Sequence, residues 1–184
     1  MTSGGNTENT TPVDVVVIGA GQAGLSAAYY LRRFGLEPET GFVVFDRSFG
    51  PGGAWQHRWP SLTLNTVNGL HDLPGSAFSD AVDTGSGEVP ASSAVPAYYG
   101  AYEKEFDLPV HRPVQVTVVC NRGERLRVET DTGVYSARGL INATGTWEHP
   151  FVPWYPGAAR FRGQQLHTKD YRDAEQFRGR HVLV

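Results

Sequence analysis

Apolar residues near the N-terminus form two continuous runs separated by a stretch of helical periodicity. The run at residues 13–18, VDVVVI, is almost wholly apolar, which is typical of a strand buried on both faces of a sheet. Residues 25–34 then place apolar side chains at helical spacing, and Gly35 follows as a C-terminal stop. A second apolar run covers residues 41–46 and ends with Asp46. This order predicts a βαβ unit over residues 12–47, with its two strands parallel.

The middle of the chain changes character twice. Residues 60–95 show little periodicity and are rich in Gly, Ser, Pro and Asp, which indicates a long functional loop or a partly disordered segment. Residues 95–107 have helical spacing, and Pro96 suits the first turn of a helix. Aromatic side chains share one side of this predicted helix, where we expect them to belong to the core: Tyr99, Tyr102 and Phe106.

Three short strand patterns follow, separated by turn signals. They cover residues 114–119, 125–130 and 133–135, and the tripeptides at 121–123 and 131–133 favour turns. This arrangement predicts a three-stranded antiparallel meander. A further strand pattern at residues 139–144 is expected to return to the parallel sheet.

A glycine-rich turn of the form G-x-G-x-x-G joins the first strand to the first helix. Gly19 permits the tight turn, Gly21 lets the backbone approach a pyrophosphate, and Gly24 lets the helix pack closely against the strand. The N-terminus of that helix favours negative charge. Asp46 follows Gly24 by 22 residues, where a carboxylate accepts hydrogen bonds from the ribose hydroxyls of an adenosine. The turn, the helix and the acid together indicate a dinucleotide site.

Composition narrows the classes of function. The chain has 184 residues, of which 40% are hydrophobic, enough for one globular domain. A formal net charge of -3 and the absence of a dense Lys or Arg run argue against a nucleic-acid partner. Apolar runs are far shorter than the ~20 residues that span a bilayer. Residues 1–11 are expected to be a flexible tail without the features of a signal peptide, so we expect no membrane association and a cytoplasmic location.

Cysteine and histidine usage excludes two further chemistries. Cys120 is the single cysteine, so the chain lacks the C-x-x-C pair of disulfide reductases, and we expect Cys120 to be a small buried or half-buried strand residue. The six histidines are scattered, without cysteine or paired carboxylates at ligand spacing, and we predict no metal site.

Three further motifs carry a family resemblance. GGAW at residues 52–55, shortly after Asp46, resembles the second flavin-contacting segment of the flavin-containing monooxygenases and their Baeyer-Villiger relatives. NATG at residues 142–145 resembles the segment that closes the FAD site in these enzymes. Residues 161–171 match the fingerprint F-x-G-x-x-x-H-x-x-x-Y through Phe161, Gly163, His167 and Tyr171. The Baeyer-Villiger branch usually has Trp-Pro or Trp-Asp where this chain has Tyr-Arg, so the resemblance is closer to the flavin-containing and N-hydroxylating branch.

The resemblance implies a fold, a chemistry and a set of site residues. The implied fold class is α/β, a Rossmann-type parallel sheet with an inserted antiparallel β-meander. In the family, NADPH reduces FAD, O2 adds to give a flavin C4a-hydroperoxide, and a small-molecule substrate takes one oxygen atom. Asn65 is expected either to approach the flavin ring as a tentative catalytic residue or to be a plain turn residue. By resemblance, Val116 contacts adenine through its backbone and His167 is structural or linking. The implied cofactor-binding residues are Gly19, Gly21, Gln22, Ala23, Gly24, Asp46, Arg47, Gly53, Ala54, Trp55, Val116, Thr144 and Gly145.

The same resemblance suggests how the chain is divided. Residues 12–150 would be the first part of a FAD-binding Rossmann domain, and residues 151–184 a fingerprint linker followed by a first strand, at 182–184, of a truncated NADPH-binding domain. The second G-x-G-x-x-G of the family is missing, so the NADPH site is expected to be absent and this piece inactive by itself. Two other hypotheses stay open: a noncatalytic FAD-binding or nucleotide-binding fragment, and an NAD-binding oxidoreductase, against which the GGAW and ATG motifs argue. Whether a completing chain or a homo-oligomer forms also stays open.

Overall fold

The computed structural model describes residues 10–83, 85 and 88–184, so most of the tail expected at residues 1–11 lies outside the described residues. The first strand, β1 (Thr10–Ile18), begins earlier than expected. Thr10 and Thr11, assigned to the tail from the sequence, instead pair in register with Val134 and Tyr135. The other strands and helices are α1 (Gln22–Arg33), β2 (Phe42–Phe45), α2 (Phe78–Ala81), α3 (Ala91–Glu105), β3 (Val110–His111), β4 (Val116–Arg122), β5 (Arg125–Thr130) and β6 (Val134–Asn142). Short 3-10 turns are η1 (Gly53–His57), η2 (Ala158–Arg160), η3 (Thr168–Asp170) and η4 (Glu175–Phe177).

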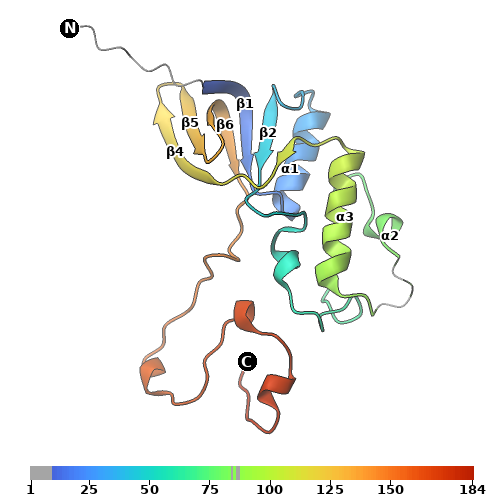
Figure 1. Ribbon diagram of the computed structural model, residues 1–184, viewed down its shortest axis with the longest axis vertical. Helices are drawn as coiled ribbons and strands as arrows, with labels where there is room; N and C mark the ends of the chain where they lie inside the picture. Colours follow the sequence, from blue (N-terminus) through green and yellow to red (C-terminus); the bar gives the residue numbers. More distant parts are fainter. Residues whose placement is uncertain (1–9, 84, 86–87) are drawn as a thin grey trace, which may run out of the picture.

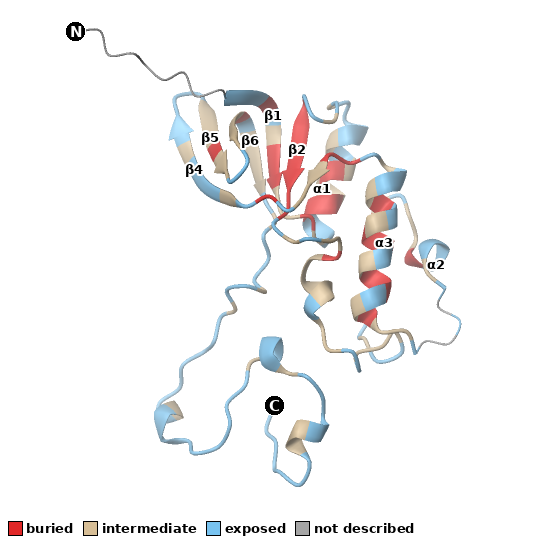
Figure 2. Cartoon of the chain, in the orientation of Figure 1, coloured by how far each residue is buried: buried red, intermediate tan, exposed pale blue. Residues whose placement is uncertain are grey.

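The strands form one sheet in the order β3-β2-β1-β6-β5-β4 (Figure 1). The first four strands are parallel to one another, β5 is antiparallel to β6, and β4 is antiparallel to β5. Val16 and Val17 at the centre of β1 are fully buried, as the continuous apolar run indicates for a strand with neighbours on both sides (Figure 2). The expected α/β fold, a Rossmann-type parallel sheet with an antiparallel meander, is confirmed.

The third strand of the meander and the expected return strand are one continuous strand. In the sequence, the apolar pattern of this strand is interrupted by two polar residues and a glycine, namely Ser136, Arg138 and Gly139. This interruption led us to predict two separate strands. In the structure β6 pairs antiparallel with β5 over its first half and parallel with β1 over its full length. The ladder to β1 supplies hydrogen bonds across the interruption, with Gly139 opposite Val15.

Helix α3 begins at Ala91, four residues before the expected start, and Pro96 lies inside the helix rather than in its first turn. A proline at this position removes one helical hydrogen bond, and the helix nevertheless continues through it to Glu105. The ring of Pro96 fills the space beside Gly52, where a Cβ would lie 2.6 Å from it. Tyr99 and Tyr102 are buried, which confirms their place in the core, and Phe106 packs against the same cluster.

The loop expected at residues 60–95 has little regular structure apart from the single turn of α2 and the start of α3. Two buried tyrosines of α3 attach it to the helix. The hydroxyl of Tyr98 accepts a hydrogen bond from the backbone N–H of Leu73 at 2.7 Å and donates one to the carbonyl of Ser76 at 2.6 Å. The hydroxyl of Tyr102 donates to the carbonyl of Pro74 at 2.7 Å.

Residues 150–184 extend away from the sheet as an arm with short 3-10 turns and largely exposed side chains (Figures 1 and 2). One aromatic contact with the body is between Trp59 and Tyr171, whose ring centroids lie 5.0 Å apart. The strand expected at residues 182–184 is not formed, since these residues are exposed and have no regular structure. A strand needs a neighbouring strand for its hydrogen bonds, and residues 182–184 do not pair with any strand of the sheet β3-β2-β1-β6-β5-β4. Among the described residues, none of the helices has the length and apolar character needed to cross a membrane.

Candidate functional site

A cavity of about 730 Å³ lies beyond the carboxyl ends of the parallel strands β2, β1 and β6. The chain leaves β1 toward β2 on one side and later returns to its other side as β6, so the strand order reverses between β1 and β6. Open α/β sheets bind ligands at such a point. The volume falls within the ~300–1,000 Å³ range of small-molecule and cofactor sites.

The glycine-rich turn forms the floor of this cavity, and each glycine is there for a different steric reason. Gly19 has a positive φ of 98°, and a Cβ there would lie 2.5 Å from the carbonyl oxygen of Ala143. A Cβ on Gly24 would lie 1.8 Å from the carbonyl oxygen of Gly19, so the close packing of helix on turn requires glycine. A Cβ on Gly21 would meet no protein atom within 4 Å. The space in front of Gly21 therefore belongs to the cavity, where a ligand can approach the backbone closely.

The N-terminus of α1 points its backbone N–H groups at the same space. Gly21 is the N-cap residue, its position carries no side-chain cap, and no acidic residue occupies the first turn. The positive end of the helix is thus neither capped by a side chain nor neutralised by an acid of its own first turn. This end is suited to a phosphate or pyrophosphate group.

Asp46 follows β2 and is the buried charged residue at the edge of the cavity, with 5% of its surface exposed. Its Oδ2 accepts a hydrogen bond from the backbone N–H of Ala20 at 2.9 Å, and its Oδ1 accepts one from the N–H of Ser48 at 2.8 Å. The bond from Ala20 ties the end of β2 to the glycine-rich turn after β1, and the bond from Ser48 is local to the segment after β2. They leave lone pairs on both oxygens, because a carboxylate has roughly four acceptor positions.

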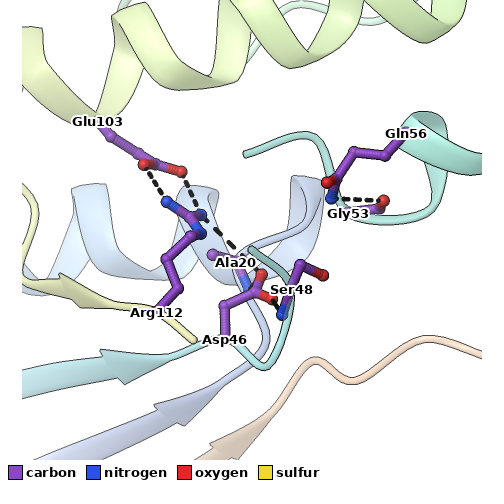
Figure 3. A network of polar contacts seen from close by, with 7 residues as sticks. All are labelled: Ala20, Asp46, Ser48, Gly53, Gln56, Glu103 and Arg112. Atoms are coloured by element: carbon purple, nitrogen blue, oxygen red, sulfur yellow. Dashed lines mark hydrogen bonds and ion pairs between the residues drawn. The ribbon is translucent and has the colours of Figure 1, made fainter. Parts of the chain in front are cut away.

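A largely buried arginine lies beside this carboxylate (Figure 3). Arg112, which follows β3, donates from Nη1 and Nη2 to the two oxygens of Glu103 on α3, at 2.6 Å and 2.7 Å. Its Nη2 also lies 4.0 Å from Oδ2 of Asp46. Burial lowers the pKa of Arg112, but the hydrogen bond and charge of Glu103 and the charge of Asp46 outweigh burial and raise it overall.

Aromatic side chains form another wall of the cavity, with Trp55 and Tyr99 on it. Burial raises the pKa of Tyr99 to about 12, against a smaller opposing effect of its hydrogen bond with Trp55, so Tyr99 is neutral at physiological pH. Next to this wall, the guanidinium of Arg58 lies 4.7 Å from the ring centre of Trp147 and 5.6 Å from that of Trp55. Desolvation lowers the pKa of Arg58, whose charge is stabilised by these cation–π contacts.

Two charged side chains from opposite walls join at the cavity rim. Arg47, next to Asp46, forms an ion pair with Glu148, which follows β6, at 2.7 Å. Both side chains are close to half exposed, and both line the cavity. Ion pairs of this kind contribute about 0–1 kcal/mol.

The structure places most of the expected cofactor-binding residues in one location. Those that line the cavity are Gly19, Gly21, Gln22, Ala23, Asp46, Arg47, Gly53, Ala54, Trp55, Val116, Thr144 and Gly145. Gly24 lies behind the turn, as its expected packing role requires. Their contacts with a cofactor stay predictions.

The other expected site residues lie apart from the cavity lining. Asn65 is exposed within a turn that follows η1. The fingerprint residues are all on the arm, namely Phe161, Gly163, His167 and Tyr171. Glu103 and Arg112 were missed from the sequence because a helix residue and a loop residue nine positions apart show no pattern that predicts their pairing beside Asp46. Within the described ranges, no group of three or more His, Cys, Asp or Glu side chains is arranged to hold a metal ion.

Comparison with known proteins agrees with this geometry. Residues 16–184 match the model of a family described as pyridine nucleotide-disulphide oxidoreductase. A flavin-containing monooxygenase from Stenotrophomonas maltophilia is 43% identical, with a TM-score of 0.76 over 91% of this chain and 49% of that one. A steroid monooxygenase structure described as oxidised and bound to NADP is 29% identical, with a TM-score of 0.60 over 86% of this chain and 31% of that one.

A curated relative also matches almost all of this chain but only about half of its own length. An uncharacterised CzcO-like oxidoreductase of Geobacillus kaustophilus is 31% identical over 94% of this chain and 47% of its own length. The chain thus spans about half the length of the curated relatives that it matches first.

Proposed function

Because the chain belongs to the pyridine nucleotide-disulphide oxidoreductase family, we propose that it is the FAD-binding part of a flavin monooxygenase that uses NADPH. The observation that carries this proposal is the cavity itself. It combines open space in front of Gly21, the uncapped N-terminus of α1 and the buried carboxylate of Asp46 at the carboxyl ends of parallel strands. Each of these features suits one part of an adenine dinucleotide.

The proposed residue roles follow from position in the cavity. The amides at the N-terminus of α1 bind the pyrophosphate, and Asp46 accepts hydrogen bonds from the adenosine ribose. Val116 lines the part of the cavity next to the meander and would contact adenine through its backbone. Trp55 and Thr144 lie on the walls proposed for the flavin half, where aromatic and backbone groups exclude water.

The similarity to a solved structure favours monooxygenase chemistry over the disulphide chemistry in the family description, because the structure with 43% identity is a flavin-containing monooxygenase. When bound, FAD would supply O2 activation and transfer of one oxygen atom to a small molecule, after reduction by NADPH. NADP in the related steroid monooxygenase supports the choice of nicotinamide cofactor.

A second candidate is a piece that binds FAD without turning over. It is favoured by the position of Asn65 and of the fingerprint residue His167, both apart from the cavity lining. In this case the residues that present NADPH and substrate to the flavin belong to another part of the protein.

The test is a titration of the flavin-free chain with FAD by calorimetry, with FMN as the matched ligand. FMN lacks the adenosine half, so the ribose and adenine contacts proposed here require FAD to bind much more tightly than FMN. Equal binding of the two flavins, or binding of NAD in preference to FAD, would overturn the proposal. Adding NADPH to the FAD complex without oxygen then tests whether this chain presents the nicotinamide to the flavin. Bleaching of the flavin absorbance would show that NADPH reduces the bound FAD and would exclude the second candidate, whereas a stable yellow complex is expected if the NADPH site belongs to another part of the protein.

A further inference from the structure

We propose that Arg112, held in place by Glu103, is a positioning residue that keeps the carboxylate of Asp46 in the orientation that binds the ribose of the dinucleotide. This role rests on the proposed function, which supplies the ribose. It gives the largely buried ion pair between α3 and the segment after β3 a role in the cofactor site in addition to its contribution to stability.

Three separate elements bring the charged groups together (Figure 3). Asp46 follows β2, Glu103 is on α3, and Arg112 follows β3. Nη2 of Arg112 is shared, since it donates to Oε1 of Glu103 at 2.7 Å and faces Oδ2 of Asp46 at 4.0 Å. Arg112 does not line the cavity, so its effect on a bound dinucleotide passes through Asp46.

Burial makes this arrangement consequential. The side chains of Arg112 and Glu103 are each 12% exposed and that of Asp46 is 6% exposed. Two carboxylates therefore share one guanidinium in a region with little water. Without Arg112, Asp46 would lose the cation that faces its Oδ2 and would be free to turn away, and Glu103 would lose the two hydrogen bonds that both of its oxygens accept.

The orientation of Asp46 depends on contacts from two sides. The N–H groups of Ala20 and Ser48 each hold one carboxylate oxygen, and Arg112 faces the oxygen that Ala20 holds. If Asp46 rotated, it would lose at least one of these two amide bonds together with an acceptor for the ribose hydroxyls. A loss of ribose binding and a loss of amide protection should therefore appear together.

The first test is a double-mutant cycle on FAD affinity. R112M should raise the FAD dissociation constant at least tenfold, and D46N should raise it by a similar factor. The double variant R112M/D46N should bind no more weakly than D46N, because Arg112 acts through Asp46. Losses that multiply in the double variant, or wild-type affinity in R112M, would overturn the proposal.

Two more variants separate positioning from stability. E103Q/R112M removes one buried carboxylate charge along with the arginine, so it should regain thermal stability relative to R112M while its FAD affinity stays low. Recovery of affinity along with stability would show a purely structural role and overturn the proposal. R112K retains the cation without the two-pronged contact, so it should fold and bind FAD with intermediate affinity even if R112M does not fold. The matched control is R32M, which breaks the exposed Arg32–Asp107 ion pair and should leave FAD affinity unchanged.

A measurement without FAD tests the positioning directly. Amide hydrogen exchange at Ala20 and Ser48 should be at least tenfold faster in flavin-free R112M or R112K than in the wild type, and unchanged in R32M. If the wild type fails to bind FAD, the proposed function falls, while this exchange measurement still decides whether Arg112 holds Asp46. Unchanged exchange at both amides in the arginine variants would overturn the positioning role even if FAD binds.

Discussion

Replacing Gly21 with valine should separate cofactor binding from folding. Gly21 has φ -83° and ψ -171°, an extended conformation that a β-branched residue adopts readily. A Cβ at this position meets no protein atom within 4 Å, so the added side chain occupies cavity space rather than core space. We expect G21V to change the free energy of unfolding by less than about 1 kcal/mol in the absence of FAD.

The same side chain should block the approach of a pyrophosphate. Hydrogen bonds to charged groups contribute about 1.5–3 kcal/mol each, and displacing the pyrophosphate from two amides at the N-terminus of α1 would cost about 3–6 kcal/mol. This range corresponds to a rise of roughly 100-fold or more in the FAD dissociation constant. Calorimetric titration of flavin-free wild-type and G21V protein measures that ratio.

G24A is the matched variant with the opposite expectation. Its Cβ would lie 1.8 Å from the carbonyl oxygen of Gly19, a backbone atom that moves only if the turn opens. We expect a loss of about 3 kcal/mol or more in the free energy of unfolding without FAD, at or above the upper range for overpacking. Urea unfolding of both variants tests the contrast. Wild-type FAD affinity in G21V, or wild-type stability in G24A, would refute this interpretation of the turn.

Three other variants test the surroundings of the site. Y98F leaves the buried N–H of Leu73 without its hydrogen-bond acceptor, so the free energy of unfolding should fall by about 1–3 kcal/mol in urea titrations; an unchanged midpoint would contradict this. Burial raises the pKa of Tyr99 to about 12 from 10.0, so its stabilising contribution is complete below pH 10 and is lost as the pH rises toward 12. The stability of Y99F should therefore decline less than that of the wild type between these pH values, and equal slopes would count against the burial effect. E148Q removes the rim ion pair with Arg47 and should lower stability by less than about 1 kcal/mol, with a difference that shrinks in high salt; a larger, salt-independent loss would disagree.

The fold was predictable where short-range pattern decides structure. The buried run of β1, the periodicity of α1 and the turn between them are encoded within about 25 neighbouring residues, and all three are present in the structure. The start of α3 was misjudged because Pro96 suggested a first turn, whereas packing of its ring beside Gly52 compensates for its place inside the helix. The continuity of β6 likewise depends on its pairing with β1, from which it is distant in sequence.

The candidate site also contains some residues that a local sequence pattern predicts and others that depend on tertiary packing. The glycine-rich turn and Asp46 follow a known spacing, and both lie on the cavity. Arg112 and Glu103 were invisible in the sequence, because their pairing depends on how α3 lies against the end of β3. The orientation of Asn65 could not be predicted either, because the loop that carries it has no periodic pattern.

The attachment of the long loop to α3 has a consequence for how freely this protein can change. The hydroxyls of Tyr98 and Tyr102 bind main-chain atoms at three loop positions, an N–H and two carbonyls. Every amino acid offers a carbonyl, and all but proline offer the N–H, so these three hydrogen bonds depend on the path of the loop and not on its side chains. With the buried Leu73 kept apolar and Asp72 kept as the acceptor for the N–H of Phe78, a library randomised at the exposed Asn68 and His71 should yield a high share of folded variants.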